Sequence, residues 1–181
     1  MKLLKLVLLA AMFSATSAFV VVTTVIWKAQ KEYSVKTDMG YFKGLDALIS
    51  FDEINPEKSR IVASIDATSF ETGNGLMNTH AKDKEGLYTE RYRLITFVST
   101  SIKRIEGSRY EATGNLSLKG IMKEIKLPFT FDSKNNVMDR FPMVPKGTFA
   151  GKIVINSKDF NITRDGAPPT VVIDLMIPVK Q

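Results

Sequence analysis

The sequence contains no cysteine among its 181 residues. This absence excludes disulfide bonds, thiolate metal sites, cysteine nucleophiles and a lipid anchor attached to cysteine. Disulfides usually stabilise small exported domains, so an exported chain of this composition depends on its hydrophobic core. With 44% hydrophobic and 24% charged residues, the composition is that of an ordinary globular protein.

Histidine is almost as scarce, because His80 is the only one. Asp83 and Glu85 follow it closely, but zinc sites use at least three protein ligands, drawn largely from histidine and cysteine. Nucleophile elbows, P-loops and glycine-rich dinucleotide motifs are also missing. We therefore predict no metal site, no catalytic residue and no enzymatic activity, with a structural or surface role for His80. A hydrolase or isomerase that uses His80 with a nearby serine or aspartate is the alternative.

No run of basic residues is long enough for a nucleic-acid interface. The formal net charge is +6, but lysine and arginine are interspersed with aspartate and glutamate along the chain. We therefore predict no nucleic-acid partner. The sequence leaves peripheral contact with an anionic membrane and formation of a homodimer open.

One long apolar run is present, at the N-terminus. Two lysines precede an apolar stretch at residues 6–13 and a run of small residues, which is the pattern of a secretory signal peptide. We predict that residues 1–18 form a cleaved signal peptide and that residues 19–181 form the mature domain, located in the periplasm or secreted. Residues 19–27 stay apolar, so an uncleaved inner-membrane anchor that extends to about residue 26 is the alternative. The β-branched content of this stretch favours a first strand over a continued helix.

Residues 114–131 give the clearest structural signal. Apolar and polar residues alternate on both sides of a turn at Lys119 and Gly120. A period of two is typical of a half-buried strand, and two such runs around a glycine predict a β-hairpin. One face of this hairpin must be covered by more sheet or by a ligand. The residues on that face are Leu116, Leu118, Ile125, Leu127, Phe129 and Phe131.

Most of the remaining chain shows the same alternation, and turn-forming residues separate the runs. The alternation stops between residues 75 and 88, where we expect one short helix. No repeat or linker divides the chain. About eight strands with regular turns predict a single all-β domain, an antiparallel sandwich or barrel. The expected strands lie at residues 30–39, 45–51, 59–70, 94–102, 109–131, 148–156 and 170–179, with a connection at residues 40–44.

Several segments resemble the YceI-like family of bacterial exported proteins in sequence and in order. They read FKGLDALISFDEINPEKS (42–59), IDATSFETGNGLMNTH (65–80), ITFVSTSI (95–102) and GNLSLKGIMKEIKLPFTF (114–131). The family patterns run as a G-x-F-x-G-L-x-G-x-I-x-F-D hairpin, a strand ending in S-I-x-T-G, a short R-D-x-H-L segment, a P-x-I-x-F-x-S-T strand and a G-x-L-T-L-x-G-V-T-K hairpin. The resemblance covers residues 41–162, and the order of the segments makes it more specific than any one motif.

The resemblance implies an antiparallel, lipocalin-like β-barrel of about eight strands with one short helix. Members of the family bind a long isoprenoid lipid, such as a polyprenyl quinone, in an elongated apolar cavity. A barrel of this size has an interior wide enough for side chains or for one small ligand. The expected function is therefore non-enzymatic binding of an isoprenoid-type lipid, which is the expected partner, with no cofactor other than such a bound polyisoprenoid or quinone.

Strand parity assigns the residues that face the barrel interior and would contact the lipid. Periodicity alone fits a filled interior equally well, so a solid-core structural or interaction module, tethered to the cell envelope and without a ligand, is the alternative. The predicted ligand-binding residues are Ile65, Phe97, Leu116, Leu118, Ile125, Leu127, Phe129, Phe149, Ile153, Ile155, Ile173 and Leu175.

The chain departs from the family patterns mainly in the irregular connections. Met77 and Asn78 replace an Arg-Asp pair, Ala81 replaces a leucine and Asn161 replaces a glycine; the proline before the 95–102 strand is missing. Apart from the proline, these positions lie where the barrel mouth is expected. Met77 is expected to make that mouth more apolar, because methionine adapts to irregular apolar partners.

Overall fold

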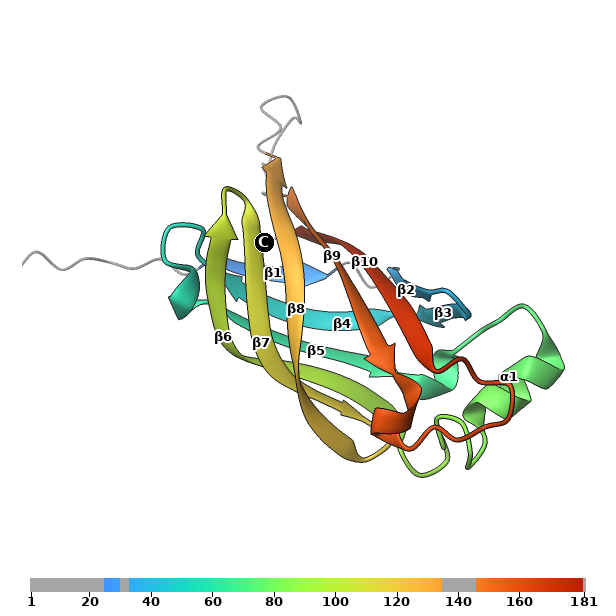
Figure 1. The fold of residues 1–181 in the computed structure, drawn as a ribbon. Coiled ribbons are helices and arrows are strands. Elements are labelled where there is room, and N and C mark those ends of the chain that lie inside the picture. Colours follow the sequence, from blue (N-terminus) through green and yellow to red (C-terminus); the bar gives the residue numbers. More distant parts are fainter. Residues whose placement is uncertain (1–24, 30–32, 135–145, 181) are drawn as a thin grey trace, which may run out of the picture.

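The computed structural model describes residues 25–29, 33–134 and 146–180. They form ten strands, one α-helix and three short 3-10 helices, arranged as a closed antiparallel barrel (Figure 1). The strands are β1 (Val25–Ala29), β2 (Ser34–Thr37), β3 (Gly40–Lys43), β4 (Leu45–Phe51), β5 (Arg60–Asp66), β6 (Leu94–Glu106), β7 (Arg109–Leu118), β8 (Ile121–Lys134), β9 (Lys146–Asn156) and β10 (Thr170–Lys180). The helices are η1 (Pro56–Lys58), η2 (Ala67–Ser69), α1 (Gly75–Lys82) and η3 (Ser157–Phe160).

Eight of the strands close the barrel in the order β1-β4-β5-β6-β7-β8-β9-β10, and β1 pairs back onto β10. The β2–β3 hairpin extends this sheet from the N-terminal half of β10, where Ile173 lies opposite Thr37. Because inward and outward side chains alternate along each strand, closure buries one apolar face of every strand against the others. The predicted lipocalin-like barrel with one short helix is confirmed.

The boundaries of several predicted elements change. The expected connection at residues 40–44 is wrong, because Gly40–Lys43 forms strand β3 and pairs with β2. The start of β3 also lies against Glu71, because the amide N–H groups of Tyr41 and Glu71 each donate to the other residue's carbonyl at 2.9 Å. This close approach needs glycine at position 40, where a Cβ would lie 2.4 Å from the Glu71 carbonyl oxygen. The first strand predicted at residues 30–39 is seen as β2, and residues 30–32 lie outside the described part of the chain.

The predicted hairpin forms β7 and β8, with Leu118 paired to Ile121 across the two-residue turn. Lys119 and Gly120 both have positive φ, 52° and 74°. Two left-handed residues in a row are the geometry that matches the twist of a tight hairpin. The ring of Tyr92 packs on Gly120, where a Cβ would lie 2.4 Å from a ring carbon. The turn therefore needs glycine both for its conformation and for its contact.

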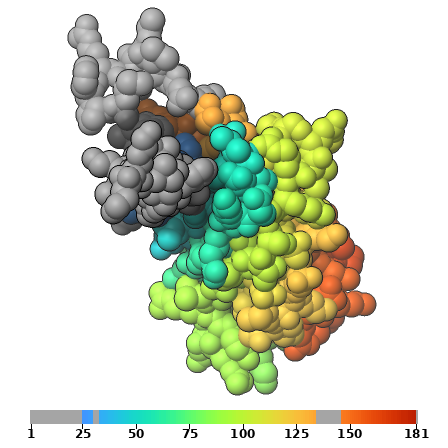
Figure 2. Space-filling view, turned by 90° about the vertical axis from the view of Figure 1, so that its left-hand side faces the viewer, coloured from blue at the N-terminus to red at the C-terminus, as the bar shows by residue number. Residues whose placement is uncertain are grey.

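The two ends of the barrel differ. At one end lie α1 and the connections β5–β6, β7–β8 and β9–β10, which we call the α1 end (Figures 1 and 2). Near the other end, five aromatic side chains pack together inside the barrel: Phe51, Tyr110, Phe129, Phe131 and Phe149, which we call the aromatic cluster. Phe51 lies at its centre, with ring centroids 4.9–5.7 Å from the other four. The cluster fills the interior at this end.

Candidate ligand-binding cavity

The interior of the barrel is hollow between the aromatic cluster and the α1 end. A cavity of about 400 Å³ lies there, with a wall made almost entirely of aliphatic and aromatic side chains. This volume falls within the roughly 300–1,000 Å³ of small-molecule sites. Several inward-facing residues on its wall, such as Ile125, Ile153 and Ile173, are only half-buried. In a filled core these side chains would be covered on all sides, so their exposure reflects open space inside the barrel.

The structure places all twelve residues of the predicted ligand-facing set on the wall of this cavity. They come from β5 to β10, and the alternation that assigned them continues through each strand without a shift of face at these positions. Their contact with a ligand stays a prediction. Sequence reasoning missed the wall contributed by β4, where Leu45, Ala47 and Ile49 also line the cavity. The alternation of the LDALISF segment contained this signal.

Connections and the β2–β3 hairpin supply lining residues that periodicity could not assign. Val35 and Phe42 reach the cavity from the hairpin, Phe70 and Leu87 from the β5–β6 connection, and Ile162 from the β9–β10 connection. Each lies in irregular structure or in a four-residue strand. Their position depends on how distant segments fold over the barrel, and no local pattern encodes it.

Phe129 and Phe149 line the floor of the cavity, the end next to the aromatic cluster, together with Ile177, which pairs with Phe149. Both phenylalanines belong to the aromatic cluster, and the other three members do not line the cavity. The floor rings are 5.8 Å apart, and Phe131 packs behind Phe149 at 4.4 Å. The cavity therefore ends against a wall of closely packed rings.

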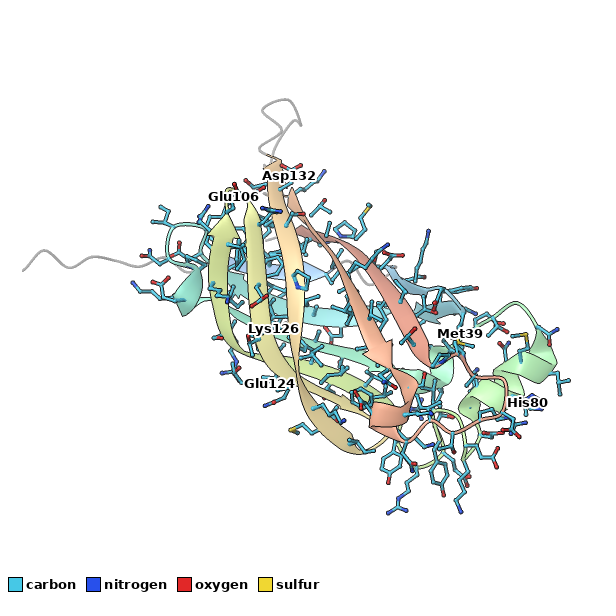
Figure 3. All side chains as sticks on the ribbon, viewed as in Figure 1. Met39, His80, Glu106, Glu124, Lys126 and Asp132 are labelled. Atoms are coloured by element: carbon cyan, nitrogen blue, oxygen red, sulfur yellow. The ribbon has the colours of Figure 1, made fainter. Side chains whose placement is uncertain are left out.

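Helix α1 lies at the mouth. Met77, His80 and Ala81 line the cavity from this helix, which has no buried residue of its own. Asn74 caps its N-terminus by accepting from the amides of Leu76 and Met77 at 3.0 and 3.1 Å. Met77 is 48% exposed, in agreement with the apolar mouth expected from its replacement of a charged residue. Figure 3 shows His80 and Met39 near this end, and Glu106 and Asp132 at the opposite end.

The helix is fastened to the barrel through Asn78. The Thr72 amide and hydroxyl both donate to Asn78 Oδ1 at 2.8 Å, and Asn78 Nδ2 donates to the Glu71 carboxylate. Glu71 in turn is bonded to Tyr41 through both backbone groups. The aspartate that the family pattern has at this position could not donate to a carboxylate at neutral pH. Asn78 is therefore suited to its partner Glu71.

Three connections meet in a polar layer beside the mouth. Lys119 is 7% exposed, and its ammonium donates to the carbonyls of Asn161 at 2.7 Å and Glu85 at 3.2 Å. Burial lowers the pKa of Lys119, while Asp83 and Glu85 act in the opposite direction. Arg164 forms ion pairs with the same two carboxylates. These contacts join the β5–β6, β7–β8 and β9–β10 connections.

Asn161 occupies the position where the family pattern has glycine. Its φ is 53°, in the left-handed region, and it ends the short helix η3. Asparagine is one of the few residues other than glycine that adopt this conformation readily. The substitution therefore keeps the local backbone and leaves the Asn161 carbonyl free to accept from Lys119.

Metal and membrane-helix features are not seen in the described residues. Within residues 25–29, 33–134 and 146–180, no group of three or more histidine, cysteine or acidic side chains is placed to hold a metal ion. Among the helices of the same residues, none is both long and apolar enough to cross a membrane. The predicted signal peptide at residues 1–18 lies outside the described residues.

The attachment of α1 should weaken in acid. The Asn78 amide and the Gly73 N–H donate to the Glu71 carboxylate and hold its pKa below the ordinary 4.5. A carboxyl group with a lowered folded-state pKa stabilises the fold above its unfolded pKa and loses this contribution as the pH falls through the folded value. Asn78→Ala should therefore destabilise the protein at pH 7, and the difference from the unmodified protein should shrink toward pH 3.

Urea unfolding at both pH values measures this difference. Thr79→Ala is the matched control, because Thr79 lies on the same helix and its hydroxyl donates only to the Gly75 carbonyl. Its effect on the free energy of unfolding should not depend on pH. An Asn78→Ala effect that is the same at both pH values would contradict the role assigned to Glu71.

Fold and cavity together define a lipocalin-like barrel with one apolar internal site, closed at one end by aromatic rings and covered at the other by a short helix. The sequence belongs to the YceI-like family, since the YceI-like domain matches residues 18–180. Protein YceI from Salmonella arizonae is 34% identical over 142 residues, which are 78% of this chain and 72% of the relative.

Solved structures show the same fold. BcnA from Burkholderia cenocepacia matches with a TM-score of 0.70 and 24% identity, over 86% of this chain and 96% of that one. A polyisoprenoid binding domain from Saccharophagus degradans, implicated in plant cell wall breakdown, matches with a TM-score of 0.60 and 14% identity, over 85% of this chain and 97% of that one. At these identities the likeness concerns the fold.

Proposed function

We propose that this protein binds an isoprenoid-type amphiphile, such as a polyprenyl quinone, in the barrel cavity and sequesters or carries it without chemical change. The hollow apolar cavity is the observation that supports this proposal most strongly. Membership of the YceI-like family and the fold shared with a polyisoprenoid binding domain also support it. A solid core without a ligand is the less favoured function, because the inward-facing residues surround open space.

The distribution of polar groups favours an amphiphile that enters tail first. Thr37, Thr72, His80 and Arg164 line the cavity at or near the α1 end, whereas Phe129 and Phe149 line its floor. A tail inside the cavity gains about 0.8 kcal/mol per buried CH₂ group, so tight binding needs few hydrogen bonds. A head group at the mouth would meet side chains that can donate to it.

No catalytic step is proposed. His80 lies at the mouth, and no described cysteine or second histidine accompanies it. If His80 took part in a reaction, His80→Ala would remove a measurable activity. Under the binding function, His80→Ala should change only the affinity for the head group.

Export is part of the proposal. The signal-peptide pattern at residues 1–18 supports delivery to the periplasm or beyond, and a barrel without cysteine folds without an oxidative step. N-terminal sequencing of the protein from its own cells tests this part. A first residue near position 19 is the expected result, and an intact Met1 favours the anchored alternative. Gel filtration of the same preparation distinguishes a monomer from a homodimer.

Calorimetric titration of delipidated protein tests the ligand class. Farnesol should bind more tightly than a straight-chain alcohol with the same number of carbons. Ile153 and Val154 give a matched pair of variants, since Ile153 lines the cavity and its neighbour points outward with 61% exposure. Ile153→Asn should weaken farnesol binding about tenfold or more, because an amide inside an apolar site lacks partners. Val154→Asn should leave binding unchanged. No binding of either alcohol, or equal losses in both variants, contradicts the proposal.

A further inference from the structure

We propose that Phe129 and Phe149 act as a stop that sets the longest lipid tail the cavity accepts. The inference rests on the proposed function above and adds which residues determine specificity for tail length. It follows from the difference between the two ends of the cavity. The mouth is bordered by connections and a helix without buried residues, whereas the floor is bordered by packed aromatic rings.

The floor is held in place from behind. Tyr110 stacks on Phe129 with a centroid distance of 5.4 Å and an interplanar angle of 22°. Phe131 contacts Phe149 at 4.4 Å, and Phe51 touches both floor rings at 5.7 and 5.4 Å. All five rings are at most 6% exposed. A tail that reaches the floor cannot displace these rings without breaking several aromatic contacts at once.

The backbone behind the cluster is equally close. A Cβ on Gly147 would lie 2.6 Å from the ring of Phe131 and 3.3 Å from the Asp132 carbonyl oxygen. Strands β8 and β9 therefore approach each other closely where they carry Phe129, Phe131 and Phe149. This leaves the rings little room to move deeper into the barrel.

The middle of the cavity is wide by comparison. Ala47 and Ala63 are paired across β4 and β5, and both line the cavity. Two small side chains at one level leave space that larger residues would fill. The tail can therefore extend past this level until it meets the floor. A larger residue at Ala63 should shorten the part of the cavity that a tail can occupy.

Affinity should thus depend on tail length in two phases. Each isoprene unit that enters the cavity should raise affinity about tenfold or more, because it removes apolar surface from water. Units added after the tail reaches Phe129 and Phe149 stay outside, and they should add little. The series of affinities should rise and then level off.

Native mass spectrometry measures this dependence in one sample. The mature protein is mixed with equimolar geraniol, farnesol, geranylgeraniol and solanesol. For the unmodified protein, affinity should stop rising at one tail length, which we call the break. Phe149→Leu should move the break toward longer alcohols. Ala63→Leu should move it toward shorter ones. Phe160→Leu is the matched control, since Phe160 is a buried phenylalanine that neither lines the cavity nor belongs to the aromatic cluster, and its break should stay in place.

The outcomes separate the two proposals. Binding that rises through solanesol without a break, or a break at the same length in Phe149→Leu and Ala63→Leu as in the unmodified protein, overturns the stop while the binding function stands. Binding of none of the four alcohols overturns the binding function and the stop with it. Should Phe149→Leu fail to fold, Ala63→Leu decides the matter alone, because an unchanged break in that variant contradicts the stop.

Discussion

Replacing Phe51 with alanine is expected to lower the free energy of unfolding by about 3–5 kcal/mol. Phe51 is 2% exposed, and its ring contacts the four other members of the aromatic cluster. Removing it costs the transfer free energy of the ring and leaves a hole that surrounding rings, fixed by closely paired strands, cannot fill by relaxing. This cluster fills one end of a barrel that is otherwise hollow.

Urea denaturation followed by circular dichroism measures the loss. Leu48→Ala is the matched control, because Leu48 lies on the same strand, faces outward and is 48% exposed. It should cost less, about 1 kcal/mol, since only about half of its surface leaves water on folding. Equal losses in the two variants would show that the cluster does not have the stabilising role assigned to it.

Replacing Ala47 with leucine is expected to abolish most ligand binding while the fold keeps its stability. The added carbons project into the cavity and displace about as many carbons of a lipid tail, which costs about 2 kcal/mol or more. That figure corresponds to an affinity lowered roughly thirtyfold. Farnesol titration and urea unfolding of the same sample give the two quantities.

Ala112→Leu provides the opposite case. Ala112 is another buried alanine of the barrel, with no exposed surface, but it does not line the cavity. Extra carbons in a filled region force neighbours apart, so this variant should lose about 1–3 kcal/mol of stability. If Ala47→Leu were destabilised as much as Ala112→Leu, the interior near Ala47 would be filled, and the cavity would not be available to a ligand.

Strand parity was enough to predict which strand residues face the cavity. Ile153 and Ile155 on β9, and Ile173 and Leu175 on β10, line the cavity as their alternation predicted. The signal is local and needs only the period of two. A bulge would have inverted the assignment of a strand, but the register irregularities between β6 and β7 fall beyond the lining residue Phe97. The chosen positions therefore lie on the cavity wall, and their contact with a ligand stays a prediction.

Whether the wall encloses space could not be predicted in the same way. Hollowness depends on the summed volume of side chains from all strands, including small ones such as Ala47, Ala63 and Gly151. The sequence alternation of a hollow barrel and that of a filled one are alike. The resemblance to a family favoured the cavity, and the structure shows it.

The mouth was the least predictable part of the molecule. Two of its contacts join segments far apart in sequence: the pairing of Tyr41 with Glu71, and the hydrogen bond from the Lys119 ammonium to the Asn161 carbonyl. The sequence pattern identified Lys119 only as a turn residue. It is buried because the tight turn at the end of β7 directs its side chain between two neighbouring connections.

The proposed function requires that the cavity hold an isoprenoid lipid in the cell. Native mass spectrometry of the protein purified from its own cell envelope, without added lipid or delipidation, tests it most directly. The predicted result is a complex whose excess mass, released on activation, is that of a prenyl lipid, with the complex lost in Ala47→Leu and kept in Val154→Asn. A protein that carries no lipid under these gentle conditions, or an excess mass that persists unchanged in Ala47→Leu, would contradict the claim.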